Sequence, residues 1–261
     1  MTGNGKTMKQ QTARSLTRFK LPLAVATTLL ATACTSVPNP NPQDPWESYN
    51  RSMFKFNDAV DGAVLKPVAE GYTALTPQPV RTCVHNMFNN LRDVWSGLNS
   101  FLQGEHVDFF NTLGRVLFNS TMGLGGCIDV ATMNGSKRIQ NDFGVTLGVW
   151  GLDAGPYFVI PFMGPSTVRD ATGAGIGLVS GASGIGPILD LDNVRVRNSL
   201  LGLDAVDARA NLLNAERIVN DIALDRYSFI RDAYLQRRQA QVNARTGAEE
   251  DALPDYSDDD E

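Results

Sequence analysis

The chain has 261 residues, of which 43% are hydrophobic, and its formal net charge is −5. This length fits one domain with tails, and the hydrophobic content excludes a wholly disordered chain. Two histidines, His85 and His106, are too few for a multi-histidine metal site. We expect neither a metal nor a cofactor.

Charge lies mainly at the two ends of the chain. Five basic residues and no acid precede Cys34, whereas residues 249–261 hold eight acids and no base. The body between them is close to neutral. Nucleic acid requires a broad basic face for its phosphates, so we exclude it as a partner. The acidic tail, residues 244–261, is expected to be disordered.

The N-terminus has the pattern of an export signal. Its basic start leads into 13 mostly apolar residues, 21–33, which are too few to span a bilayer as a helix. The small residues 31–33 directly before Cys34 are typical of a bacterial lipobox. Residues 1–33 are therefore predicted to be a signal peptide, Cys34 the acylated first residue, and residues 34–43 a linker. The alternative is an ordinary cleaved signal in which Cys34 has no role.

The first expected helix begins at Asp44, with Asp44 as its cap and Pro45 at its first position. An apolar stripe follows at helical spacing and is expected to face the core: Trp46, Tyr49, Met53, Phe56 and Val60. Pro67, Pro77 and Pro79 predict short pieces with bends in the next region.

Four further segments show helical periodicity, namely residues 80–101, 107–117, 200–219 and 225–243. Each carries an apolar stripe. The ordinary interpretation is an amphipathic helix that packs this stripe on a core. Cys83 and Cys127 are the cysteines left after Cys34. They form either a disulfide in an exported protein or two small buried apolar residues, and the sequence leaves both open.

Residues 143–189 are the least polar part of the chain. They carry three charges, Asp153, Arg169 and Asp170, and residues 144–187 contain 11 of the 24 glycines. Glycines spaced by four form a groove on a helix where another backbone or an acyl chain approaches closely. Residues 171–189 have the length of a membrane span, but their small residues favour a segment that lies along or dips into the bilayer.

No local motif nominates a catalytic site. The segment 181–184 is one residue short of the Gly-x-Ser-x-Gly nucleophile elbow, and neither histidine is followed five positions on by an aspartate. A Walker loop is absent from the sequence. We therefore expect no enzyme. An uncharged, glycine-rich half beside amphipathic helices instead indicates a body that shelters an amphiphile.

A series of ordered motifs resembles the VacJ/MlaA lipoprotein family over residues 44–238. The most specific are residues 44–57 (DPWESYNRSMFKFN), 99–104 (NSFLQG), 118–126 (FNSTMGLGG), 143–148 (FGVTLG) and 164–166 (GPS). The resemblance implies an all-α, ring-like arrangement of amphipathic helices over residues 44–243. This ring is expected to lie in the inner leaflet of the outer membrane and to enclose a channel.

The resemblance also implies a function. Such a lipoprotein extracts mislocalised phospholipids from the outer leaflet, passes them to a periplasmic MlaC-like carrier, and associates with a trimeric porin. Alternatives are a structural lipoprotein that scaffolds a porin or the envelope without moving lipid, and a phospholipase.

Residue roles follow in part from the resemblance. It implies that Cys34 is the lipid anchor and that Phe56 and Asn57 belong to a motif near the channel. On physical grounds, four charged residues are candidates for facing a lipid headgroup: Asp129, Asp153, Arg169 and Asp170.

Overall fold

The structure, a computed structural model, describes residues 41–179 and 184–247. The predicted signal peptide, the acylation site at Cys34 and the acidic residues from 248 onward lie outside this part.

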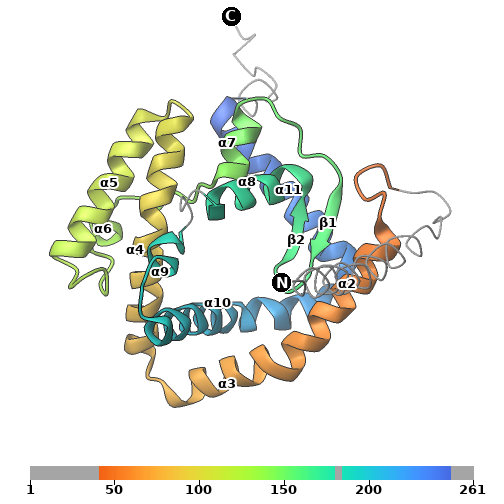
Figure 1. Cartoon of the computed structure of the whole chain (residues 1–261), viewed down its shortest axis with the longest axis horizontal. Coiled ribbons are helices and arrows are strands. Elements are labelled where there is room, and N and C mark those ends of the chain that lie inside the picture. The colour runs from red at the N-terminus through yellow and green to blue at the C-terminus, as the bar shows by residue number, and fades with distance from the viewer. Residues whose placement is uncertain (1–40, 180–183, 248–261) are drawn as a thin grey trace, which may run out of the picture.

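Helices arranged in a ring form most of the molecule (Figure 1). In chain order, the elements are α2 (Glu47–Val60), η1 (Asp61–Leu65), α3 (Lys66–Leu75), α4 (Gln78–Leu102), α5 (His106–Thr121), α6 (Val130–Met133), α7 (Phe143–Val149), β1 (Tyr157–Ile160), β2 (Gly164–Thr167), α8 (Val168–Val179), α9 (Gly186–Leu189), α10 (Val194–Ile222) and α11 (Arg226–Thr246). The helices α3 and α10 pack along one edge, α4 forms a second edge, and α7, α8, α11 and the hairpin close the ring. The predicted all-α, ring-like fold is confirmed, with one small hairpin added.

The ring begins with an almost unbroken helical stretch from Glu47 to Leu75. Its central part, η1, is one turn of π-helix that ends two residues before Pro67. Proline has no N–H and its ring clashes with the carbonyl four residues earlier, and a π turn relieves this conflict. The bend predicted from Pro67 therefore becomes a widened turn.

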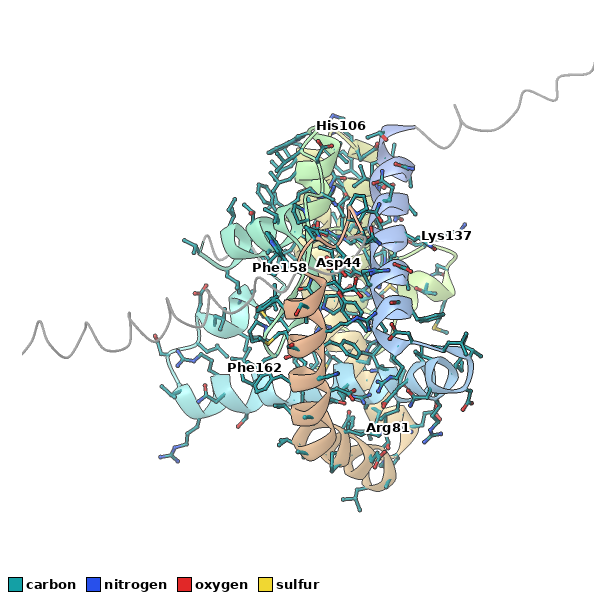
Figure 2. The ribbon with its side chains drawn as sticks, turned by 90° about the vertical axis from the view of Figure 1, so that its right-hand side faces the viewer. Asp44, Arg81, His106, Lys137, Phe158 and Phe162 are labelled. Carbon is teal, nitrogen blue, oxygen red and sulfur yellow. A yellow bond between two sulfur atoms is a disulfide. The ribbon has the colours of Figure 1, made fainter. Side chains whose placement is uncertain are left out.

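The predicted helix start at Asp44 is wrong. Helix α2 begins at Glu47, and its N-cap position, Trp46, makes no side-chain cap bond. Asp44 is fully buried instead and lies between α2 and α11 (Figure 2). Its carboxylate accepts hydrogen bonds from Asn50 Nδ2 (2.7 Å) and Arg231 Nη1 (3.1 Å). Tertiary partners thus use the oxygens that a helix cap would have used.

The hairpin β1–β2 lies where Pro156, Pro161 and Pro165 exclude a continuous helix. Its strands are antiparallel, with Tyr157 paired to Thr167 and Ile160 to Gly164. The helix α2 holds it through amides, because Asn50 Oδ1 accepts from Val159 N (2.9 Å) and Asn50 Nδ2 donates to the Tyr157 carbonyl (3.1 Å). The small apolar core lies here, where Tyr157 and Val159 pack against Tyr227 of α11.

Closely spaced glycines bring α7 and α8 together, so another backbone, one of the two expected occupants, fills the glycine groove at Gly173. A Cβ placed on Gly173 would lie 2.5 Å from the backbone nitrogen of Gly144, a distance that real Cβ atoms do not show. The two backbones are therefore in contact, and neither position has room for a side chain. This contact places the middle of α8 beside the start of α7.

The polarity of the ring helices is inverted relative to a water-soluble protein. The buried residues of α4 and α5 are mainly polar: Asp93, Ser96, Asn99, Ser100, Thr112, Arg115 and Asn119, with Phe88 and Gly97. The apolar stripes face outward and are exposed: Val80, Met87, Val94, Leu98 and Phe101 on α4, and Val107, Phe110, Leu113 and Leu117 on α5. The expectation that these stripes pack on a core is wrong. An exposed apolar surface of this extent marks a contact with lipid or protein.

Helix α2 shows the same inversion. Asn50 is fully buried, whereas Trp46 and Phe56 of the expected core stripe are 48% and 43% exposed. Met53 does pack against the small core.

A disulfide joins Cys83 on α4 to Cys127 in the loop after α5. It ties the outer helix pair together. The possible span at residues 171–189 is divided between α8 and α9, and within the described residues none of the helices is apolar enough over a sufficient length to cross a bilayer.

Candidate functional site

A cavity of about 490 Å³ lies inside the ring. Its walls come from α4, α7, the hairpin, α8, residues 184–185 and α11. The apolar part of the wall includes Trp95, Phe143, Ile160, Met163, Ala174, Leu178 and Ile185, and the polar part includes Arg92, Asn99, Asn141, Asp142, Ser166, Asp170, Tyr234 and Arg238. Such a mixed lining suits a molecule with a polar head and an apolar body.

Arg238 of α11 organises the polar wall. Its Nε and Nη2 atoms donate to the two carboxylate oxygens of Asp170 on α8, at 2.9 and 2.8 Å. Its Nη1 and Nη2 atoms donate to Asp142 before α7, at 2.6 and 2.9 Å. Tyr234 adds a hydroxyl donor to Asp170 at 2.7 Å. One guanidinium therefore fixes three segments of the ring relative to one another.

This pairing keeps both carboxyl groups ionised. Burial alone would raise the pKa of Asp170, but hydrogen bonds and charge from Arg238, with Tyr234, hold it below its ordinary value. Burial likewise opposes ionisation of Asp142, whose pKa is lowered by Arg238 and by the backbone N–H of Val145. Because charges in a buried setting need partners, removal of Arg238 would leave Asp142 without its ion pair and Asp170 with Arg169 and Tyr234 as its remaining partners.

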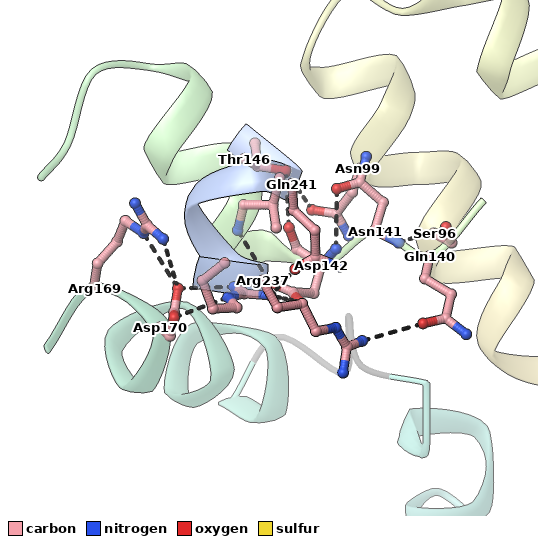
Figure 3. A network of polar contacts seen from close by, with 12 residues as sticks. Ser96, Asn99, Gln140, Asn141, Asp142, Thr146, Arg169, Asp170, Arg237 and Gln241 are labelled. Atoms are coloured by element: carbon pink, nitrogen blue, oxygen red, sulfur yellow. Dashed lines mark hydrogen bonds and ion pairs between the residues drawn. The ribbon is translucent and has the colours of Figure 1, made fainter. Parts of the chain in front are cut away.

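Amide and hydroxyl groups hold the loop before α7 against α4 (Figure 3). The backbone nitrogen of Asn141 donates to Ser96 Oγ (2.9 Å), and Asn141 Nδ2 donates to Gln103 Oε1 (2.8 Å). Thr146 Oγ1 then donates to Asn99 Oδ1 (2.8 Å). Buried polar groups that satisfy one another in this way define one arrangement of the wall.

Of the predicted headgroup residues, the structure places Asp170 in the cavity wall. Arg169 is its buried neighbour, 4% exposed, and donates to Asp170 Oδ1 from Nε and Nη2, both at 3.2 Å. Arg169 does not line the cavity itself.

The other two headgroup candidates lie elsewhere. The Asp129 carboxylate receives two bonds from Arg115 Nη2, at 3.0 and 2.9 Å, and caps α6. Burial opposes its ionisation, but hydrogen bonds from Thr132, Asn119 and Arg115 lower its pKa to about 2. Asp153 is exposed in the loop between α7 and β1. Neither residue lines the cavity, so their headgroup role has no geometric support.

Phe56 and Asn57 contact the hairpin rather than the cavity. Asn57 Nδ2 donates to the Ile160 carbonyl (2.9 Å), and Asn57 Oδ1 accepts from Phe162 N (2.8 Å). The Phe56 ring meets the Phe162 ring edge-on, with centroids 5.3 Å apart. Because Ile160 and Met163 do line the cavity, Asn57 acts on it by holding the hairpin turn.

Sequence reasoning missed Asp142 and Arg238. Asp142 had a local signal, because it directly precedes a helix and caps it through Val145 N (3.0 Å). Arg238 was one arginine among several on the last helix. Its partners are 68 and 96 residues away, and no spacing rule reaches that far.

Comparison with known proteins agrees with this architecture. The model of the MlaA lipoprotein family matches residues 42–241. An intermembrane phospholipid transport system lipoprotein MlaA from Haemophilus influenzae is 36% identical over 216 residues, covering 81% of this chain and 84% of that protein. The Escherichia coli protein of the same name is 33% identical over 226 residues, covering 85% and 87%.

A solved structure gives the same result in three dimensions. It comes from work on the structural basis for maintenance of bacterial outer membrane lipid asymmetry, and it is 31% identical in sequence. It superposes with a TM-score of 0.64 over 77% of this chain and 99% of the solved one. The family model, the sequence relatives and the solved structure together show that this chain belongs to the MlaA lipoprotein family.

Proposed function

We propose that this protein is an outer-membrane lipoprotein that takes mislocalised phospholipid from the outer leaflet through its central cavity and releases it toward the periplasm. Its relatives are named as lipoproteins of an intermembrane phospholipid transport system. The role is physical transfer, and no covalent step is part of it.

One observation supports this function most strongly: the cavity inside the ring has a polar wall and an apolar wall, while apolar side chains cover α4 and α5 on the outside. A charged headgroup that crosses hydrocarbon unaided pays a large desolvation cost. A cavity with a polar wall and an apolar wall lowers that barrier, because headgroup and chains each keep a suitable environment.

The same inversion supports embedding in one leaflet. Val107, Phe110 and Leu117 on α5 are each more than half exposed, an arrangement that water disfavours and lipid tails accept. A helix lying in the interface needs no spanning length. Acylation at Cys34 would add a second attachment, and two attachments hold a protein to a membrane far better than one.

A plugged cavity tests the function. Ala174 is exposed on α8 and lines the cavity, so Ala174→Trp would place an indole inside it. Ile176, two residues further along α8, is exposed and does not line the cavity, which makes Ile176→Trp the matched control. Each variant is expressed in cells that lack the gene, and outer-leaflet phospholipid is measured by its cleavage with added phospholipase.

We expect cells with Ile176→Trp to resemble wild type and cells with Ala174→Trp to accumulate surface phospholipid as the deletion strain does. Full function of a folded Ala174→Trp protein would contradict the proposal and favour the structural alternative, a lipoprotein that scaffolds a porin or the envelope.

Transfer to a periplasmic MlaC-like carrier and association with a trimeric porin belong to the same proposal. The family resemblance supports both partners. Photo-crosslinkers at exposed positions of α11 and α5 would test them. We expect carrier adducts from positions on α11 and porin adducts from positions on α5. Adducts to neither partner from any position would contradict these assignments.

A further inference from the structure

A second, smaller cavity of about 300 Å³ adjoins the central one. Three arginines line it, together with four amides, one serine and one aspartate: Arg92, Arg138, Arg237, Asn89, Gln140, Asn141, Gln241, Ser96 and Asp142. We name this cavity the arginine recess. None of its arginines was singled out by the sequence motifs.

The arginine recess shares three wall residues with the central cavity. Arg92, Asn141 and Asp142 line both. A molecule with its polar end in the recess would therefore have its remainder directed past these residues toward Trp95, Phe143 and Leu178 of the apolar wall. The two cavities together offer separate places for a head and for tails.

Charge pairing around the recess leaves one positive charge uncompensated. Arg92 is paired with Asp204 of α10, and Arg138 Nε donates to the buried Asp93 at 2.6 Å. The wall's own acid, Asp142, is held by Arg238.

Arg237 differs from these arginines. Its Nη2 donates to the neutral Gln140 Oε1 at 3.2 Å (Figure 3), and among the described residues it has no carboxylate within ion-pair distance. The recess thus presents one guanidinium that is hydrogen-bonded to a neutral amide and has no ion-pair partner among the described residues.

We propose that the arginine recess binds the phosphate group of a phospholipid headgroup, with Arg237 as the principal contact, while the acyl chains occupy the central cavity. This inference rests on the proposed function and names a site within it. A phosphodiester carries one negative charge, which matches the single unpaired guanidinium. Arginine is suited to this task because its planar fork donates two parallel bonds to phosphate oxygens.

Binding of short-chain lipids to the purified full-length protein in detergent tests this site. The probes are dihexanoyl phosphatidylglycerol, dihexanoylglycerol, which has the same chains but no phosphate, and inorganic phosphate. The variants are Arg237→Gln and Gln140→Glu, whose new carboxylate would pair with Arg237. The control is Arg217→Gln, which alters an exposed arginine of α10 that lines neither cavity.

We expect Arg237→Gln and Gln140→Glu to weaken phosphatidylglycerol binding about tenfold, the effect of losing one charge-assisted hydrogen bond. Dihexanoylglycerol binding should stay unchanged in every variant, and Arg217→Gln should match wild type for both lipids. Both substitutions lie at exposed side chains, so folding is expected to be retained, and circular dichroism checks it.

Three results would overturn the assignment. Equal phosphatidylglycerol binding by wild type and Arg237→Gln would remove Arg237 from the site while leaving lipid transport intact. Inorganic phosphate bound as tightly as the lipid would identify a site for the free ion. Wild type that binds neither lipid would contradict the proposed function itself.

Discussion

Arg238 shows how much of this molecule depends on single polar residues. It is 8% exposed and donates to Asp142 and Asp170, which belong to different segments of the ring. Its pair with Asp170 is buried on both sides. Removing one partner of a buried ion pair costs about 3–5 kcal/mol, because the remaining charge stays desolvated with weaker compensation. The cluster therefore holds the start of α7, α8 and α11 in one position relative to one another.

Arg238→Gln should lower the free energy of unfolding by about 3–5 kcal/mol. Its neighbour Arg237 is exposed and makes one hydrogen bond to a neutral group. Arg237→Gln should therefore change the free energy of unfolding by at most about 0.5 kcal/mol. Urea unfolding in detergent, followed by circular dichroism, measures both. Equal stability of the two variants would show that the Arg238 cluster does not hold the ring.

The lowered pKa values of Asp142 and Asp170 predict acid sensitivity. A carboxyl whose pKa is lower in the folded state stabilises the fold above its unfolded pKa, 3.8 here, and loses that contribution as pH falls through the folded value. Stability should therefore decline below about pH 4. In Asp170→Asn the decline between pH 5 and pH 2 should be shallower, as unfolding midpoints across that range would show. An unchanged slope would mean that Asp170 is not held ionised by Arg238.

Part of the Arg238 cluster could be predicted from the sequence. Asp170 was identified because it is one of only three charged residues in residues 143–189, and a charge in an apolar segment needs a partner. The partner itself could not be predicted, since Arg238 is distant in the sequence. The predicted helix cap at Asp44 was wrong for a related reason. A local capping motif does not show that Asn50 and Arg231 donate to the same carboxylate in the folded protein.

At the scale of elements, the glycines of α7 and α8 set how closely the helices approach. Gly173→Ala would force a methyl group against the backbone of Gly144 and should lower stability by about 1–3 kcal/mol. Gly175, on the same helix, has no atom within 4 Å of an added Cβ. Gly175→Ala should therefore raise stability by up to about 1 kcal/mol, through helix propensity. Equal effects of the two substitutions on stability would show that close packing does not explain why position 173 is a glycine.

Most helices could be predicted because their periodicity is local. The segments expected at residues 80–101 and 107–117 became α4 and α5 with boundaries shifted by a few residues, and α11 ends at Thr246 rather than at residue 243. The direction in which their apolar stripes face could not be predicted, because periodicity is identical for a core and for a lipid-facing surface. The hairpin itself was not predicted, although Pro156, Pro161 and Pro165 exclude a continuous helix there.

At the scale of the whole molecule, the apolar outside of α4 and α5 should bind membranes without acylation. A Cys34→Ala chain is expected to bind vesicles of phosphatidylethanolamine and phosphatidylglycerol. Replacing Phe110 and Leu117, which are 66% and 56% exposed, by aspartate should release it, because the lipid-facing apolar area is interrupted by charge.

A matched control adds the same two charges on α11, through Gln236→Asp and Gln239→Asp, both at exposed polar positions. Flotation of vesicles on a density gradient measures the bound fraction. Similar loss of binding in both double variants would attribute the effect to charge alone rather than to the apolar face.

The central claim is that phospholipid passes through the inside of the ring. A photoreactive benzoylphenylalanine at Ala174, in cells whose phospholipids carry radioactive phosphate, tests it most directly. Met163 lies in the wall of the same cavity, so Met163→Trp should narrow the space that lipid would occupy. The account predicts a labelled lipid adduct at position 174 that falls strongly when Met163→Trp is added. A position that captures no lipid, or an adduct unchanged by Met163→Trp, would contradict it.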